Sequence, residues 1–192
     1  MGRRTHQPDD TGSTRPQVFT FGHGTADAET ITRLLRDVGV RMLIDVRTAP
    51  GSRRNPHTAR AAMSRWLPQA GIDYRWDERL GGWRRREPDS PDLALRNESF
   101  RGYAAHMRTG EFRTAIDELV AGAKDGATAV MCAESVWWRC HRKLISDYLV
   151  LACDVDVRHL MPDGSLRPHR PSPEARLVEE EEHLLVYDKQ GG

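Results

Sequence analysis

The segment ATAVMCAESVWWRCHRKLISDYLVL, residues 127–151, changes its character twice. Ala127 to Cys132 is a short apolar run without charge, which is typical of a strand buried on both faces of a sheet. Ala133 to Cys140 carries the polar and aromatic residues of a loop. From His141 to Leu151, apolar residues recur at helical spacing, at positions 144, 145, 148 and 149. The segment therefore predicts a buried strand, a loop and a helix, in that order.

The chain on either side of this segment continues the alternation of strands and helices. Further strands are expected at 17–21, 41–46, 72–76 and 156–160, and further helices at 58–69, 100–107 and 112–120. The helix after the first strand has the clearest pattern, with apolar residues at 31, 34, 35 and 38 between a capping Thr25 or Asp27 and a terminating Gly39. This alternation predicts one Rossmann-like α/β domain, with a mostly parallel open sheet and helices on both faces.

Three parts of the chain differ in composition. Residues 1–16 are polar and lack periodic apolar positions, which predicts a disordered N-terminal tail. Residues 17–161 hold the α/β domain, and residues 162–192 form a C-terminal extension that begins with a proline-rich connector over 162–173. Within the extension, residues 175–178 and 183–187 are expected to pair as a small hairpin around a solvated acidic turn, 179–182.

Length and composition limit the class of protein. The 192 residues fit one domain with extensions, and 29 basic residues nearly balance 28 acidic residues. No apolar run is long enough to span a bilayer, and the N-terminus lacks the apolar centre of a secretory signal. Three cysteines at irregular spacing do not form a disulfide framework. Reduced thiols and a cytoplasmic location are therefore expected.

Polar side chains follow three of the expected strands at the point where each strand ends. His23 follows the first strand, Asp45 and Arg47 end the second, and Cys132 and Glu134 end the buried strand of the opening segment. Ligands of open α/β sheets bind outside the carboxyl ends of the strands, near the point where the strand order reverses. We therefore expect these five side chains to line one pocket.

The residue types at this edge suit chemistry on an anion. Cys132 is the candidate nucleophile or redox thiol, with Glu134 and His23 as proton carriers and Asp45 as a further catalytic candidate. Arginines can hold an anion through charge-assisted hydrogen bonds. The substrate-binding candidates near the strand ends are Arg47, Arg53, Gly81, Gly82, Arg139, His141 and Arg142.

Structural roles are the alternative for several of these residues. A carboxylate in an apolar strand, such as Asp45, can simply bind loop N–H groups or Arg47. A free cysteine at the end of a buried strand, such as Cys132, is often a small core residue. Residues 140–142 can form a helix start that packs beneath the preceding tryptophans.

Familiar motifs do not match the spacing of these groups. Arg139 follows Cys132 one position too late for the anion cradle of phosphatase and rhodanese loops. Cys132, Cys140 and His141 are metal-ligand types, but they lack the paired CxxC spacing of a structural zinc site. The glycines at 22 and 24 are too few for a dinucleotide fingerprint. The sequence therefore predicts neither a metal nor a cofactor.

Several ordered motifs resemble the DUF488 family, a group of small bacterial and archaeal proteins of largely undefined function. These motifs are FGHGT, IDVRTAPGSRRNP, GIDYRWDERLGG, RNESFRGYAAHM and MCAESVWWRCHR. The likeness runs from about Val18 to Leu160, and the ending PSPEARLVEEEEHLLVYD is similar to a family ending. The resemblance implies a Rossmann-like α/β domain over residues 17–161 but names no reaction.

The resemblance also implies which positions recur in the family. They correspond here to Gly22, His23, Asp45, Arg47, Ser52, Arg53, Leu80, Gly81, Gly82, Tyr103, Cys132, Glu134, Cys140, His141 and Arg142. Ser52 and Tyr103 thereby join the substrate-binding candidates. Gly24 stands where members commonly have serine, so this chain carries no hydroxyl there.

These patterns predict a cytoplasmic enzyme, a cysteine-dependent transferase or hydrolase, that acts on an anionic small molecule or a nucleotide-like group. One alternative is a nucleic-acid-associated protein, with the arginines of 47–54 and 83–86 on phosphates and tryptophans stacked on bases. The other is a binding or regulatory module without turnover. The formal charge of +1 counts against nucleic acid, and no membrane partner is expected. The oligomeric state stays open.

Overall fold

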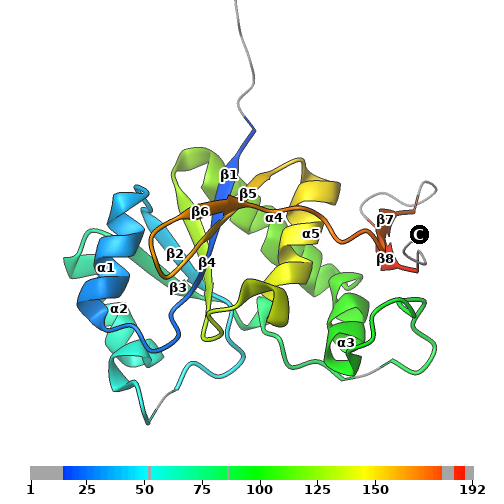
Figure 1. Cartoon of the computed structure of the whole chain (residues 1–192), viewed down its shortest axis with the longest axis horizontal. Coiled ribbons are helices and arrows are strands. Elements are labelled where there is room, and N and C mark those ends of the chain that lie inside the picture. Colours follow the sequence, from blue (N-terminus) through cyan, green and yellow to red (C-terminus); the bar gives the residue numbers. More distant parts are fainter. Residues whose placement is uncertain (1–14, 52, 86, 179–183, 189–192) are drawn as a thin grey trace, which may run out of the picture.

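The computed structural model describes residues 15–51, 53–85, 87–178 and 184–188. Its main sheet has six strands in the order β3-β2-β4-β1-β5-β6 (Figure 1). The strands are β1 (Gln17–Gly22), β2 (Met42–Asp45), β3 (Asp73–Trp76), β4 (Thr128–Cys132), β5 (Asp156–Leu160) and β6 (Leu166–Pro168). Strands β1 to β5 pair in parallel, and β6 pairs antiparallel with β5. The predicted open, mostly parallel sheet is confirmed.

Helices cover both faces of the sheet, as predicted. Figure 1 shows α1 (Ala28–Asp37) and α2 (Arg60–Gln69) on one side, and α3 (Glu98–Met107), α4 (Gly110–Asp125) and α5 (Arg142–Cys153) on the other. Phe19 and Phe21 of β1 pack with α1 and α2, whereas Val18 belongs to the core beneath α4 and α5. Successive side chains of a strand point to opposite faces, so β1 contributes to both cores.

The helices begin where the sequence places capping residues. The Asp27 carboxylate accepts a hydrogen bond from the backbone N–H of Thr30, at 2.8 Å, at the start of α1. Thr109 accepts from the backbone N–H of Phe112, at 3.3 Å, at the start of α4. A side-chain oxygen at the N-cap binds one of the backbone N–H groups that lack a partner within the helix. These caps fix the first turn of each helix, and Asp27 is one of the two caps that the sequence predicted for α1.

Short 3-10 helices lie in the loops that follow the carboxyl ends of β2, β3 and β4. They are η1 (Pro56–Thr58), η2 (Glu78–Leu80) and η3 (Trp137–Arg139). The η3 turn interrupts the stretch that the sequence interpreted as plain loop, between β4 and α5. These segments, together with the residues after β1, form one edge of the molecule.

The sheet continues beyond the strand that the sequence placed last. The sequence interpreted residues 162–173 as a connector, but β6 forms within it and extends the sheet beyond β5. The residues of β6 are all exposed, so the strand shows no apolar alternation that could reveal it. Pro168, which has no N–H to donate, is tolerated because β6 is an edge strand.

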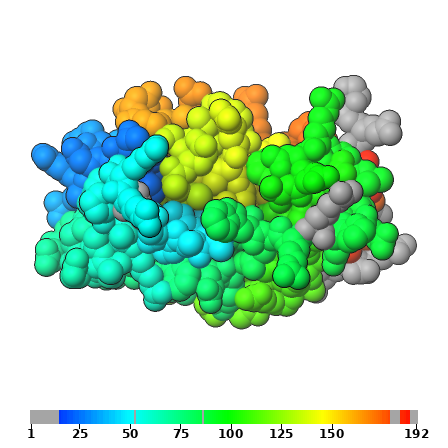
Figure 2. Space-filling view, turned by 90° about the horizontal axis from the view of Figure 1, so that it is seen from below, coloured from blue at the N-terminus to red at the C-terminus, as the bar shows by residue number. Residues whose placement is uncertain are grey.

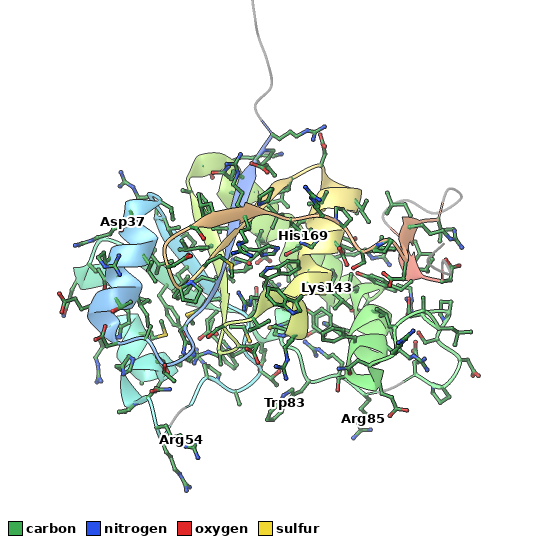
Figure 3. The ribbon with its side chains drawn as sticks, in the orientation of Figure 1. Asp37, Arg54, Trp83, Arg85, Lys143 and His169 are labelled. Atoms are coloured by element: carbon green, nitrogen blue, oxygen red, sulfur yellow. The ribbon has the colours of Figure 1, made fainter. Side chains whose placement is uncertain are left out.

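A chain of buried hydrogen bonds connects α5 to β1 across β5. The Asp147 carboxylate lies 2.8 Å from Nε2 of His169, whose Nδ1 lies 3.0 Å from Nε2 of His159. Nδ1 of His159 lies 2.6 Å from the hydroxyl of Thr20. Figure 3 labels His169 at the centre of the molecule, beside α5. All four side chains are buried, and their mutual bonds satisfy polar groups that water cannot reach.

The C-terminal extension is fixed to the domain through the same carboxylate. Asp147 accepts hydrogen bonds from the hydroxyls of Ser172, at 2.7 Å, and Tyr187, at 3.0 Å. The backbone N–H of Tyr187 donates to the buried carboxylate of Asp92, at 3.0 Å. The predicted hairpin is confirmed as β7 (Ala175–Leu177) paired with β8 (Leu185–Tyr187).

Some expectations fall outside the part of the chain that is described. Residues 1–14 of the expected tail, the acidic turn 179–182 and Ser52 are among them. In the described ranges, no helix combines the length and the apolar character needed to cross a bilayer.

Candidate functional site

The ends of β1 and β4 lie side by side and continue together into the loops. Gly22 and Cys132 are register partners in the parallel pair. Beyond them, the backbone N–H of His23 donates to the carbonyl of Cys132 at 3.1 Å, and that of Gly24 donates to Ala133 at 3.0 Å. His23 and Cys132 therefore share the carboxyl edge of the sheet, as the strand topology requires.

The Asp45 carboxylate and the Arg47 guanidinium form a buried ion pair at the end of β2. Nε of Arg47 lies 2.8 Å from Oδ1 of Asp45, and Nη2 lies 2.6 Å from Oδ2. The Tyr74 hydroxyl donates to the same Oδ2 at 2.6 Å, and the Arg47 backbone N–H donates to Oδ1 at 3.1 Å. Asp45 thus binds Arg47 and a loop N–H. This is the structural role that the sequence offered as the alternative to a catalytic role for Asp45. The pair holds the Arg47 side chain in one orientation.

His23 completes the support of Arg47. Nδ1 of His23 lies 2.9 Å from the carbonyl of Gly24, so it carries the proton, and Nε2 accepts from Nη1 of Arg47 at 3.2 Å. Burial, followed by the charge of Arg47, lowers the pKa of His23 to about 4. The imidazole is therefore neutral at neutral pH and acts on Arg47 as a hydrogen-bond acceptor.

A cavity of about 180 Å³ opens beside this ion pair, at the carboxyl ends of β2 and β4. Figure 2 views this edge, where the cyan segment after β2, the yellow-green segment after β4 and the green segment after β3 lie close together. The lining residues are Arg47, Thr48, Ala49, Gly82, Trp83, Cys132, Ala133 and His141. Four of the five N–H groups of Arg47 donate within the described part of the protein, which leaves one on Nη1 for a bound molecule.

Cys132, Cys140 and His141 form a second group at this edge, referred to here as the sulfur–imidazole cluster. Their ligand-type atoms, two sulfurs and one ring nitrogen, all lie within 4.8 Å of one another. Sγ of Cys140 lies 3.5 Å from Nδ1 of His141, and Nε2 of His141 donates to the carbonyl of Val46 at 3.0 Å. Nδ1 is therefore the nitrogen with a free electron pair, and it faces sulfur.

The surroundings of the two thiols in the cluster shift their pKa values in opposite directions. The neighbouring Cys132 thiol is the first cause that lowers the pKa of Cys140, and the charge of Arg142 lowers it further. The neighbouring Cys140, followed by burial, raises the pKa of Cys132. The sequence interpretation assigned the reactive thiol to Cys132. Cys132 remains the sulfur that lines the cavity.

Arg142 lies beneath the site rather than facing the cavity. Its side chain is 1% exposed, and Nη2 donates to the backbone carbonyl of Glu134. Gly22 leaves the space for this contact, because a Cβ atom there would collide with the same carbonyl. Arg142 therefore fixes the loop after β4 and contributes positive charge close to the two sulfurs.

The glycines and the tyrosine of the candidate set shape the site through packing. A Cβ atom at Gly81 would lie 2.8 Å from Oγ1 of Thr48, so the glycine allows the loop after β3 to approach the loop after β2. Tyr103 is fully buried, donates to the carbonyl of Leu80 at 2.8 Å and packs against His141 with ring centroids 5.1 Å apart. Tyr103 thus packs against the imidazole of His141 and helps to hold it in place.

Other candidates lie at the exposed rim. The Glu134 side chain is exposed, and its Oε1 accepts from the backbone N–H of Val136 at 3.0 Å. Arg53, in the loop after β2, and Arg139, in η3, are also exposed. His23 lines a different cavity, of about 200 Å³, to which Arg47 does not contribute. The five residues expected in one pocket thus gather at one edge but do not all line one cavity.

A known protein family matches most of the chain. A sequence model described as "Domain of unknown function DUF488" matches residues 27–149, which include β2 to β4 and the cavity-lining residues. The chain belongs to the DUF488 family. No curated protein and no solved structure matches the chain. The resemblance read from the motifs is confirmed, and the family description supplies no activity.

The DUF488 domain also places residues at the site that the sequence did not single out. Thr48 and Trp83 line the cavity, and the Thr48 hydroxyl accepts from the backbone N–H of Trp83 at 3.1 Å. The Trp83 side chain is 82% exposed, which is unusual for so large an aromatic group. The sequence could have indicated Trp83 as a site residue through its position directly after Gly81 and Gly82.

Proposed function

We propose that this DUF488 domain is an enzyme that acts on a small anionic molecule, or on the anionic group of a nucleotide-like molecule. The observation that carries the proposal is that Arg47, Cys132 and His141 line one cavity at the carboxyl edge of the sheet. This is the position at which open α/β sheets bind their ligands. The proposal includes the cytoplasmic location that the cysteine pattern predicts.

Arg47 is the anchor for the anion. The guanidinium is held rigidly by Asp45 and His23, and its remaining N–H on Nη1 is available to an acceptor. A preorganised donor loses little conformational freedom on binding, so it holds an anion better than a mobile surface arginine does. His23 and Asp45 therefore act as positioning residues for Arg47.

The sulfur–imidazole cluster supplies the reacting groups. Cys132 and His141 are its members that line the cavity. Cys132 is thus placed to attack a bound molecule, which favours transfer or hydrolysis as the class of reaction. Glu134, exposed next to the cavity-lining Ala133, is the proton carrier to solvent.

The dimensions of the cavity suggest how the ligand is held. About 180 Å³ is less than the 300 Å³ or more that is typical for a drug-sized ligand, so it suits a phosphate, a carboxylate or a similar group. The exposed indole of Trp83 lies at the same cavity and offers a flat apolar face. A planar part of a larger molecule can stack there while its anionic group reaches Arg47.

The test is protection of Cys132 from alkylation. The reduced, metal-free protein is treated with iodoacetamide at one fixed pH, with and without inorganic phosphate, simple carboxylates and nucleoside monophosphates. Peptide mass spectrometry follows Cys132, with Cys153 of α5 as the internal reference. A ligand of the cavity slows labelling of Cys132 and leaves Cys153 unchanged, and the conservative variant Arg47→Lys weakens the protection. Protection by none of these anions, or equal protection of both cysteines, would remove the proposal.

A nucleic acid is the second candidate ligand. Figure 3 shows Arg54, Trp83 and Arg85 projecting from the same lower edge of the molecule. Cationic groups beside an exposed aromatic ring suit a single strand, with phosphates on the arginines and a base on the indole. We expect weak binding, because the net charge of the chain is only +1. Submicromolar binding of an oligonucleotide at physiological salt, with a steep salt dependence, would favour this candidate over the enzyme.

A further inference from the structure

We infer that Cys132, Cys140 and His141 bind a thiophilic divalent metal ion, with zinc as the first choice, and leave a fourth position open toward the cavity. The inference starts from the placement of three ligand-type atoms within 4.8 Å of one another. It deepens the proposed function, because it rests on the same cavity and specifies what the cluster holds. It also departs from the sequence, whose cysteine spacing predicted no metal.

The distances in the cluster suit a tetrahedral site. With Zn–S bonds of about 2.3 Å and Zn–N bonds of about 2.0 Å, neighbouring ligand atoms of a tetrahedral zinc lie roughly 3.5–3.8 Å apart. Sγ of Cys140 and Nδ1 of His141 lie 3.5 Å apart. The Cys132 sulfur lies within 4.8 Å of both of these atoms, so only a small movement is needed to bring all three atoms to one ion.

The orientation of His141 is an independent indication of a ligand. Its Nε2 donates to the carbonyl of Val46 at 3.0 Å, which leaves the electron pair of Nδ1 directed at the sulfurs. Histidines that bind metals usually donate their other ring nitrogen to such an acceptor, which fixes the tautomer and the ring. Tyr103 packs against the same ring and holds it in place.

The chemistry of the donors selects the metal. Two sulfurs and one imidazole nitrogen are soft or borderline ligands, which favour zinc over magnesium or calcium. Binding removes the remaining thiol protons, and two thiolates balance the charge of a divalent ion.

The open position would give the metal a chemical role. Three protein ligands with a free fourth site are the arrangement of catalytic zinc, whereas structural zinc usually has four protein ligands. Cys132 and His141 line the cavity together with Arg47. With a metal bound, Cys132 would serve as a ligand instead of as the nucleophile, and the ion would supply the chemistry of activating a water molecule at its open position. Arg47 keeps its role as the anion anchor.

The experiment is a cobalt titration of the full-length chain. The protein is purified with a reductant, stripped with a chelator and titrated anaerobically with Co²⁺, which reports its ligands by absorption. We expect one equivalent to produce thiolate-to-cobalt charge transfer and the intense visible bands of tetrahedral cobalt, and Zn²⁺ to abolish both. Absence of these bands, or saturation only at a large excess of metal, would overturn the inference.

Variants and a second measurement make the result specific. Cys132→Ser and Cys140→Ser should each weaken cobalt binding by more than the roughly 10–100-fold typical of losing an outer-shell partner. Cys153→Ser, in the same helix as Arg142 but outside the cluster, is the matched control and should bind as the wild type does. Should the serine variants fail to fold, X-ray absorption of the zinc-loaded wild type decides, with two sulfurs at about 2.3 Å expected. A shell without sulfur would refute the site.

The outcomes separate this inference from the proposed function. If anions protect Cys132 but no metal binds, the metal site is refuted and the proposed cysteine-dependent enzyme is retained. Metal binding without anion protection in the metal-free chain retains the metal site and removes the proposed function.

Discussion

Gly82 packs directly against the imidazole of His141, so closely that a Cβ atom on the glycine would lie 2.5 Å from Nδ1. The loop after β3 and the first residues of α5 are thus in contact through the absence of a side chain. Through this contact the loop after β3 packs against the sulfur–imidazole cluster, and Trp83, the next residue of the loop, lies at the cavity. The absence of a side chain at Gly82 therefore affects both the packing of the imidazole and the shape of the cavity.

Gly82→Ala should disturb the site because the added methyl group meets the ring and cannot be accommodated without movement. Overpacking of this kind costs about 1–3 kcal/mol in the free energy of unfolding. We also expect Co²⁺ binding to the cluster to weaken. The matched control is Gly51→Ala, in the loop after β2, where a Cβ atom would meet no other group. Equal effects of the two changes on urea unfolding and on cobalt binding would show that the close packing at Gly82 is unimportant.

Asp45→Asn should destabilise the protein strongly. Asp45 is fully buried and its partner Arg47 is 7% exposed, so the substitution leaves a buried guanidinium without its counter-charge. Breaking such a pair from one side costs about 3–5 kcal/mol. The measurement is chemical denaturation. As a control, Glu118→Gln removes a partly exposed partner of Arg79 and should cost less than about 1 kcal/mol. A smaller loss for Asp45→Asn than for Glu118→Gln would contradict the structural role of the buried pair.

Asp147→Ala should loosen the C-terminal extension. The substitution removes the acceptor for Ser172, Tyr187 and His169 at once, and each unsatisfied buried group costs about 1–3 kcal/mol. We expect faster hydrogen exchange over residues 172–178 and 184–188, with little change in β1 to β4. Tyr187→Phe, which removes a single bond to Asp147, serves as the milder control. Unchanged exchange in the extension would show that other contacts hold it.

The free energy of unfolding should fall as the pH falls from about 6.5 toward 4. Burial is the first cause that lowers the pKa of His23 to about 4 and that of His159 to about 3, whereas an unfolded histidine titrates near 6.5, at about its reference value. In this window the unfolded chain binds protons that the folded chain does not. The contribution of these histidines to the free energy of unfolding is therefore fully present above the window and is lost as the pH falls through it.

Urea unfolding between pH 8 and 5 measures this dependence. The groups around His159 are Thr20, His169, the stacked ring of Trp137 and the charge of Arg142. Replacement by phenylalanine removes the titrating group, so His159→Phe should show a shallower pH dependence even if its absolute stability is lower. If the free energy of unfolding changes with pH in the same way in the variant and the wild type, His159 does not contribute to the pH dependence.

The sequence determined the order and type of the main elements because these depend on local patterns. Spacing of apolar residues at 31, 34 and 35 defines the buried face of α1, and Asp27 supplies its cap. A charge-free run defines β4 as a strand covered on both faces. From parallel strands it follows that His23, Arg47 and Cys132 reach the same edge. The sequence missed β6, which is exposed and carries no such pattern.

Only the tertiary structure decided what the polar side chains at that edge do. The ion pair of Asp45 with Arg47 turns two catalytic or binding candidates into one rigid unit, and the burial of Arg142 directs it to a loop carbonyl. Cys132 ends β4 and Cys140 follows η3, and their sulfurs lie within 4.8 Å of each other in the folded chain. The physical reason is that residue spacing encodes contacts within one helix or strand. Contacts between loops depend on the positions of several strands at once, so the cavity and the sulfur–imidazole cluster exist only in the folded chain.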